Sequence, residues 1–406
     1  MSAPGIVIFA ITYLLIAVRP IAWLDRPGAV LVGAVACVAA SVLSPSEAFG
    51  AIDLEPLVLL FGVMGMGGFL AVDGFFDQVQ PRLSSMSRTP ARLLAVLVWG
   101  AGILAALITN DAVCVLGTPL VVRLIRKHGL PPLPFLLALA TAANTGSVAT
   151  LVGNPQNMLS GLLGGLDYLH YLGHMLPVAA AGLAINHLLL RLMFRRALAG
   201  AAFPIEPAPL RISGRSVTTL IVIVGSAIVY SFGGNLPWTA AGGLAVLLLL
   251  HRADADELWQ RIGWPLLVFF AGLFVVVAGF IHSGAPQAFF AHVPLAAGPP
   301  GLLSRFRLAA LFLFGSNVVS NVPFILVVQE QIPKLADPRF GWELLAMAST
   351  FAGNLTLIGS AANIIVAESS LEVGGIGFWA YLRVGVPLSL ATTAVGVLWL
   401  AFVHST

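Results

Sequence analysis

The sequence predicts an all-α polytopic membrane protein with inverted-topology repeats: about ten transmembrane helices, two re-entrant hairpins and two helices broken at the midplane. Three observations lead to this fold class. The 406-residue chain is 59% hydrophobic and only 9% charged, whereas a soluble globular protein carries about 25% charged residues. The Lys and Arg residues gather at the ends of apolar runs. The helix-breaking phrase TLVGNPQN at 150–157 returns as TLIGSAAN at 356–363.

Ten apolar segments are long enough to be spans, because crossing roughly 30 Å of hydrocarbon takes about 20 apolar residues. The first lacks a basic n-region and a cleavage site, so it is interpreted as a span and not as a signal peptide. Cys37 and Cys114 lie within apolar runs, which argues against a disulfide framework. We place the spans near 5–23, 28–44, 54–75, 131–163, 171–193, 216–233, 236–251, 264–283, 342–367 and 378–402.

The apolar segment 93–122 is predicted to be a hairpin that enters and leaves the membrane on the cytoplasmic side. Arg82, Arg88 and Arg92 precede it, and a second basic cluster begins at Arg123. A single crossing would place one cluster outside, against the positive-inside rule. The tip of the hairpin falls at 109–111, deep in the membrane. An ordinary single span is the alternative.

The charge distribution along the whole chain supports this topology. With the hairpin in place, four basic residues fall outside and the other 16 of the 20 fall inside. Both termini are then outside, and we expect an integral protein of the bacterial inner membrane. The four outside residues are Arg305, Arg307, Lys334 and Arg339.

Three landmarks recur in the same order at nearly constant offset. The first landmark is PLVLLFGVMGMGGFL, which resembles PLLVFFAGLFVVVAGFI 209 residues later. The second is ITND, which corresponds to VSNV after 211 residues, and the third is TLVGNPQN, which corresponds to TLIGSAAN after 206 residues. The first copy begins outside and the second inside, which is typical of secondary transporters. By this repeat, 308–329 is also a hairpin. The predicted parts are an N-terminal scaffold (1–53), a first repeat (54–196; hairpin 92–126, broken helix 131–163), a linker with scaffold helices (197–263) and a second repeat (264–406; hairpin 303–333, broken helix 342–370).

Each broken helix carries polar side chains at membrane depth. Free carbonyls at such a break can bind a cation, and free N–H groups at a helix N-terminus can bind an anion. Asparagine can also simply hold helices together, which is the alternative. The polar residues are Asn144, Asn154, Gln156 and Asn157 in the first copy and Asn354, Thr356, Ser360 and Asn363 in the second.

Asp111, beside the first hairpin tip, is an intramembrane carboxylate and therefore a candidate functional group. It could ligate Na⁺, exchange a proton or receive a substrate hydroxyl; a structural hydrogen bond is the alternative. Its repeat mate is Val322, so the halves differ in charge. By contrast, Asp73 and Asp77 lie near the end of a span, where solvation is expected.

Several function classes find no support. A Walker lysine after a glycine-rich loop is missing, which argues against ATP-driven transport. We see neither a nucleophile–base pair nor a metal motif, so an enzyme is not predicted, and no cofactor is expected. A basic stripe with interleaved aromatic residues is also lacking, which argues against nucleic-acid binding.

The sequence resembles the ion-transporter superfamily of arsenite permeases, citrate and dicarboxylate permeases and NhaD-type sodium/proton antiporters. The resemblance rests on LITNDAVCVLGTPLV, TGSVATLVGNPQN, SNVVSNVPFILV and AGNLTLIGSAANIIVAE. It implies an inverted-repeat fold, often homodimeric, with elevator-like transport of an anion across the bilayer. It also implies substrate or ion binding by Thr109, Asn110, Gly153, Asn154, Pro155, Asn157, Ser320, Asn321, Gly359, Ser360 and Asn363.

The dicarboxylate branch has Ser-Asn-Thr at both tips, where this chain has Asp111 and Val322 in third position. A carboxylate there would repel a dianion, and no Arg or Lys falls at midplane depth. The predicted function is secondary active transport of a small oxyanion or its acid, arsenite-like, carboxylate or inorganic, coupled to H⁺ or Na⁺. A sodium/proton antiporter using Asp111 is the alternative. The candidate Na⁺ ligands are Asn110, Asp111, Asn154 and Asn321.

Overall fold

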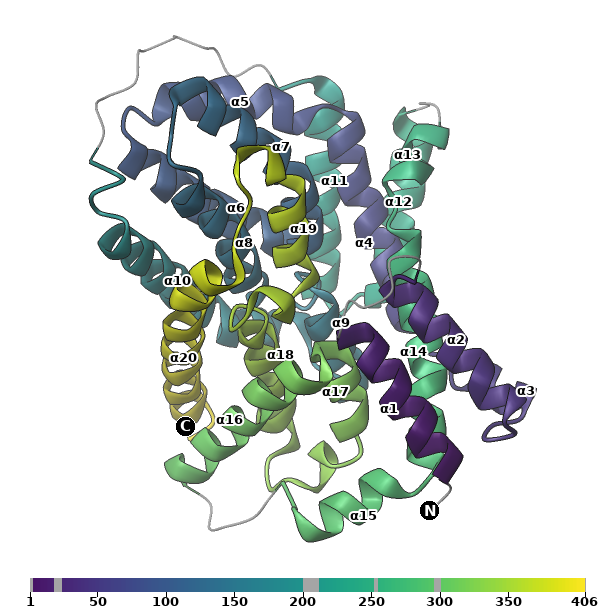
Figure 1. Ribbon diagram of the computed structural model, residues 1–406. Coiled ribbons are helices and arrows are strands. Elements are labelled where there is room, and N and C mark those ends of the chain that lie inside the picture. The colour runs from purple at the N-terminus through teal and green to yellow at the C-terminus, as the bar shows by residue number, and fades with distance from the viewer. Residues whose placement is uncertain (1–2, 18–23, 200–211, 252–254, 296–300, 406) are drawn as a thin grey trace.

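The computed structural model describes residues 3–17, 24–199, 212–251, 255–295 and 301–405, and within these ranges it is built from α-helices and short 3-10 turns (Figure 1). Residues 200–211 of the predicted linker lie outside the described residues. The first half contains α1 (Ala3–Ala17), α2 (Arg26–Ala39), α3 (Pro45–Gly50), α4 (Leu54–Val72), α5 (Phe75–Met86), α6 (Pro90–Ile108), α7 (Asn110–His128), α8 (Pro132–Ser147), α9 (Pro155–Gly164) and α10 (Tyr168–Met193). The second contains α11 (Gly214–Ser231), α12 (Leu236–His251), α13 (Ala255–Arg261), α14 (Trp264–His282), α15 (Ala285–His292), α16 (Leu302–Val319), α17 (Asn321–Val328), α18 (Pro338–Ala352), α19 (Ala361–Ser369) and α20 (Phe378–Val403).

The described helices confirm the predicted membrane architecture. Seven are long and apolar enough to cross a bilayer, and α1, α2 and α12 are shorter apolar helices. Two of the seven, α6 and α16, are the long arms of hairpins that turn back through α7 and α17. The pairs α8–α9 and α18–α19 supply the two interrupted crossings. Together with the five remaining long helices and the three shorter ones, these make the ten predicted spans.

Both hairpin tips are formed by a residue with unusual backbone geometry. Thr109 has φ 113° and Ser320 has φ 67°, although neither is glycine. Such angles are costly for residues with a Cβ and persist only where the surrounding structure holds them. The two tips occupy corresponding positions of the repeats, so the inverted symmetry extends to backbone conformation.

The helix breaks follow from local chemistry. Pro155 lacks an N–H and stands at the first turn of α9, where none is needed. Asn154 caps that helix through its side chain, which accepts a hydrogen bond from the Asn157 N–H at 2.8 Å. Gly153 is required by close approach, because a Cβ there would lie 2.2 Å from the Ser147 carbonyl oxygen.

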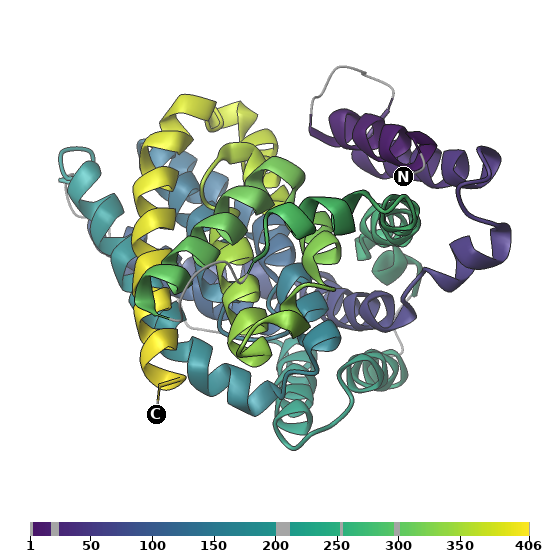
Figure 2. The same cartoon turned by 90° about the horizontal axis from the view of Figure 1, so that it is seen from below.

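The helices are arranged so that the hairpin tips reach the breaks of the opposite half. α7 packs against α19, and α17 packs against α9, while α6 lies along α8. α10 and α20 form one side of the molecule, and α1, α2, α12 and α14 form the other (Figures 1 and 2). Both termini lie at the same end of the molecule (Figure 1), and the positive-inside rule predicts that this end is outside.

Candidate functional site

A cavity of about 530 Å³ lies where the two hairpin tips and the two helix breaks meet. Its size falls within the range of about 300–1,000 Å³ that is common for small-molecule sites. One wall is polar and consists of the tips and the first turns of α9 and α19. The opposite wall is largely apolar and comes from α2, α4 and α14, with side chains such as Leu60, Met64 and Phe269.

Four helix N-termini border the polar wall. Asn110 begins α7, Pro155 begins α9, Asn321 begins α17 and Ala361 begins α19, and all four residues line the cavity. Each helix N-terminus carries partial positive charge from its free N–H groups. Their convergence makes the cavity favourable for an anion or for the oxygen atoms of a weak acid.

Three side chains with oxygen atoms add to this wall. Asp111 is half-buried and lines the cavity, and the N–H of Ala362 in the first turn of α19 is directed at its carboxyl group. Gln156 and Asn321 line the cavity, and their side-chain oxygens Oε1 and Oδ1 are buried and have no hydrogen-bond partner among the described residues. A buried acceptor without a partner is costly. These two oxygens are therefore suited to accept hydrogen bonds from the hydroxyl groups of a ligand or to coordinate a cation.

Asn144 joins the two halves directly behind the polar wall. Its Nδ2 donates to Asn354 Oδ1 at 3.1 Å and to Asn363 Oδ1 at 2.9 Å. Its Oδ1 accepts from Asn110 Nδ2 at 2.8 Å and from Ser360 Oγ at 3.1 Å. The side chain thus satisfies all of its hydrogen-bonding groups, and it connects a hairpin tip of one half to the helix break of the other.

The remaining asparagines fix the shape of the breaks. Asn157 Nδ2 donates to the carbonyl oxygens of Ser147 and Thr150 at 3.0 and 2.9 Å. In the second half, Asn363 Nδ2 donates to the Gly353 and Thr356 carbonyls at 2.7 and 3.2 Å. The two asparagines are repeat mates with the same task. Each replaces hydrogen bonds that the interrupted helix has lost.

The predicted site residues therefore divide into two layers, and binding by either layer stays a prediction. Asn154, one of the four candidate Na⁺ ligands, lies behind the wall, where its Nδ2 donates to Ser147 Oγ at 2.8 Å. Thr109, Asn110, Asp111, Pro155, Ser320, Asn321, Gly359 and Ser360 line the cavity. Asn144, Gly153, Asn154, Asn157, Asn354, Thr356 and Asn363 are not among the lining residues.

Arg26 and Arg261 also line the cavity, and the positive-inside rule predicts that both lie on the cytoplasmic side. The sequence did not predict a basic residue at midplane depth, because Arg26 and Arg261 lie at the ends of helices. The start of α2 and the end of α13 bring these two residues to the cavity. Positive charge at a mouth attracts anions from solution.

The expectation that Asp73 is solvated is wrong. Its side chain is 1% exposed, and its Oδ2 lies 3.1 Å from His251 Nε2 and accepts a hydrogen bond from Thr219 Oγ1 at 2.7 Å. Asp73 follows the last residue of α4 and contacts Thr219 of α11 and His251 of α12, long-range contacts that local sequence does not reveal. Asp77, in contrast, is exposed and forms an ion pair with Arg123 at 2.5 Å.

Comparison with known proteins identifies relatives along nearly the whole chain. The silicon efflux transporter LSI3 of Oryza sativa subsp. japonica is 30% identical, covering 97% of this chain and 96% of the relative. A transporter named arsB from Dictyostelium discoideum is 25% identical over 92% of this chain and 87% of the relative. The crystal structure of the Alcanivorax borkumensis YdaH transporter is similar at a TM-score of 0.58 with 16% identity, covering 99% of both chains.

The names of these relatives are those of transporters, and the YdaH structure has the same fold. The predicted resemblance to the ion-transporter superfamily is thereby confirmed, as are the helical membrane fold and the membrane location. Residues 13–352 match the family described as "Citrate transporter". This match covers most of the chain, and the protein belongs to that family of membrane transporters.

Proposed function

We propose that the protein is a secondary active transporter of a small oxyacid or its anion, with Asp111 as the group that couples transport to H⁺ or Na⁺. The observation that carries the proposal is the polar wall of the cavity. Four helix N-termini meet there around one carboxylate and two amide oxygens without partners. Such a wall offers partial positive charge to oxygen atoms and acceptors to hydroxyl groups.

The carboxylate at the hairpin tips favours a substrate acid that is neutral or weakly charged when it binds there. A dianion would meet the Asp111 carboxylate, and repulsion between two such charges a few ångströms apart is strong at low dielectric. A polyhydroxylated acid such as arsenious or silicic acid can instead donate hydroxyl hydrogens to Asp111, Gln156 and Asn321. Two relatives whose names concern silicon efflux and arsB support this substrate class.

Coupling follows if substrate and coupling ion use the same carboxylate. Asp111 can hold a proton or Na⁺ in one half of the cycle and a substrate hydroxyl in the other. The cation and the substrate then bind the same site in alternation, so the cation that moves down its gradient in one direction drives the substrate in the other. Arg26 and Arg261 line the cavity, and the positive-inside rule assigns both to the cytoplasmic side. This supports an inward-facing conformation in the proposed elevator-type cycle.

The Asp111→Asn variant tests this role. It keeps the shape of the side chain but removes the exchangeable charge, so we expect coupled transport to fall by at least roughly a hundredfold while folding is preserved. The measurement uses proteoliposomes with an imposed pH or Na⁺ gradient, arsenite or silicic acid as substrate, and a lumenal pH dye. Asp77→Asn, which neutralises an exposed carboxylate at the cytoplasmic surface, is the matched control.

Normal coupled transport by Asp111→Asn, with the control also normal, would contradict the coupling role. A sodium/proton antiporter is the second candidate, because Asp111 and the free Asn321 oxygen are hard oxygen ligands of the kind that bind Na⁺. In that case Na⁺ jumps alone change lumenal pH, and arsenite or silicic acid has no effect.

A further inference from the structure

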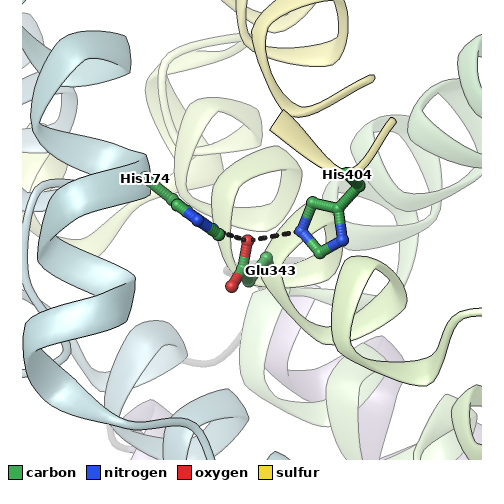
Figure 3. Close-up of side chains that lie close together, drawn as sticks. All are labelled: His174, Glu343 and His404. Atoms are coloured by element: carbon green, nitrogen blue, oxygen red, sulfur yellow. Dashed lines mark hydrogen bonds and ion pairs between the residues drawn. The ribbon is translucent and has the colours of Figure 1, made fainter. Parts of the chain in front are cut away.

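Three side chains from three helix segments converge at the outer end of the molecule, away from the cavity. Figure 3 shows His174 of α10, Glu343 of α18 and His404, which follows α20, pointing toward one another. His174 Nδ1 lies 2.8 Å and His404 Nε2 lies 3.0 Å from the same oxygen, Glu343 Oε2. These three atoms all lie within 4.8 Å of one another. The arrangement has no repeat mate among the predicted landmarks.

The carboxylate at the centre is buried and incompletely satisfied. The Glu343 side chain is 1% exposed, and its second oxygen, Oε1, has no hydrogen-bond partner in the part of the chain that the structure describes. Arg339 Nε lies 3.5 Å from that oxygen, but the Arg339 side chain is 44% exposed. A buried charge is costly unless it is paired and hydrogen-bonded or coordinates a metal. The Glu343 carboxylate can therefore bind a further cation.

His404 is held in the orientation of a metal ligand. Its Nδ1 lies 2.9 Å from Asp337 Oδ2, while its Nε2 faces Glu343. A neutral imidazole has only one N–H, and a hydrogen bond from Nδ1 to Asp337 leaves the Nε2 lone pair directed at the cluster. A carboxylate that orients a histidine through its other nitrogen is a common partner of metal-ligating histidines.

We propose that His174 Nδ1, Glu343 Oε2 and His404 Nε2 bind a Zn²⁺ ion at the outer face, with a fourth position open to water. Two histidines and one glutamate form a known ligand set for zinc. An ion about 2.1 Å from each atom in tetrahedral geometry holds neighbouring ligand atoms about 3.4 Å apart. To reach that spacing, His174 Nδ1 and His404 Nε2 each move about half an ångström away from Glu343 Oε2, and they approach one another from a separation of up to 4.8 Å.

The consequence is a metal crosslink between helices that are far apart in sequence. Zinc would tie the outer ends of α10 and α20 to the outer end of α18, which leads directly into the second helix break. Because the ion binds the folded protein and not the unfolded chain, it raises the free energy of unfolding by RT ln(1 + c/Kd), where c is the concentration of free zinc and Kd is its dissociation constant. The site is separate from Asp111, so it stands independently of the proposed transport chemistry.

The experiment uses purified full-length protein without a histidine tag, stripped with EDTA and then dialysed against ZnCl₂. We expect one zinc per chain by elemental analysis, a higher unfolding temperature in detergent with zinc, and the visible absorption of tetrahedral cobalt when Co²⁺ replaces Zn²⁺. Glu343→Gln and His174→Gln should each lower zinc affinity by at least roughly a hundredfold. Loss of a residue that only supports a ligand costs about 10–100-fold, and loss of the ligand itself should cost more. His292→Gln, which alters an exposed histidine on α15, should bind zinc like the wild type.

A metal-free arrangement makes the opposite prediction. The hydrogen bond to Glu343 raises the pKa of His404, and a doubly protonated His404 could donate to both carboxylates without an ion. Zinc would then neither bind in stoichiometric amount nor change the unfolding temperature of the wild type, and this result would overturn the proposal. Because the wild type alone decides it, the outcome does not depend on the variants folding. Retention of full zinc affinity by both variants would overturn it as well.

Discussion

Asn144 shows at the scale of one residue how the halves are joined. Its four hydrogen bonds reach Asn110, Ser360, Asn354 and Asn363, so removal of the amide leaves several buried groups without partners. We expect Asn144→Ala to lower the free energy of unfolding by about 1–3 kcal/mol. It should also reduce transport at least about tenfold, because the tip residue Asn110 loses its support. Thermal unfolding in detergent and substrate flux in proteoliposomes measure the two effects.

Asn186→Ala is the matched control for this prediction. Asn186 is equally buried, but its amide exchanges hydrogen bonds with Thr141 inside the first half at 3.0 and 3.1 Å. It should lose stability without a comparable loss of transport. If both variants transport equally well, Asn144 has a packing role only.

At the scale of elements, the close contact between α6 and α8 positions the first hairpin. A Cβ on Gly146 would lie 2.2–2.4 Å from backbone atoms of Gly102, where no side chain can yield. We therefore expect Gly146→Ala to push the helices apart and destabilise the protein by about 1–3 kcal/mol, the usual cost of overpacking. Gly100→Ala on the same hairpin arm meets no atom within 4 Å and should be neutral or slightly stabilising. Unfolding temperatures that rank the variants in the reverse order would contradict this account.

The elements themselves were largely predictable. Span 236–251 agrees with α12 at both ends, and most other apolar runs agree within a few residues, because hydropathy reports directly on lipid exposure. The first hairpin could be inferred from its flanking charges, and the second only from the repeat. The short helices α3, α5, α13 and α15 were not predicted, since they do not cross the membrane and give no hydropathy signal.

The site was predictable only in part, for a similar reason. The tip and break residues stand out because polar and helix-breaking residues are rare in apolar runs. Their division into a lining layer and a supporting layer depends on side-chain direction, which spacing does not give. The His174, Glu343 and His404 cluster has partners 169 and 61 residues apart, so no local motif announces it.

At the scale of the whole molecule, the cavity mouth makes a prediction about access. Cys37 and Cys114 are buried, so an introduced cysteine should dominate labelling. Ala361→Cys lines the cavity at the start of α19, and we expect a membrane-impermeant maleimide to label it from the cytoplasmic side at least about tenfold faster than from outside. Inside-out and right-side-out vesicles compare the two faces. Ala352→Cys, at a fully buried position, is the control, and preferential labelling from outside would contradict an inward-facing cavity.

The unequal halves have an electrical consequence. Among the described residues that line the cavity, Asp111 is the only carboxylate, and its repeat mate Val322 carries no charge. If one proton enters for each neutral acid that leaves, every turnover moves one positive charge across the bilayer. A potential of 100 mV then contributes about 2.3 kcal/mol per cycle, which is enough to sustain a concentration ratio of roughly 50 even without a pH difference. In that proposed cycle, a second carboxylate in place of Val322 would double the charge per cycle and square that ratio, and the asymmetry of the repeats would set the voltage dependence of transport.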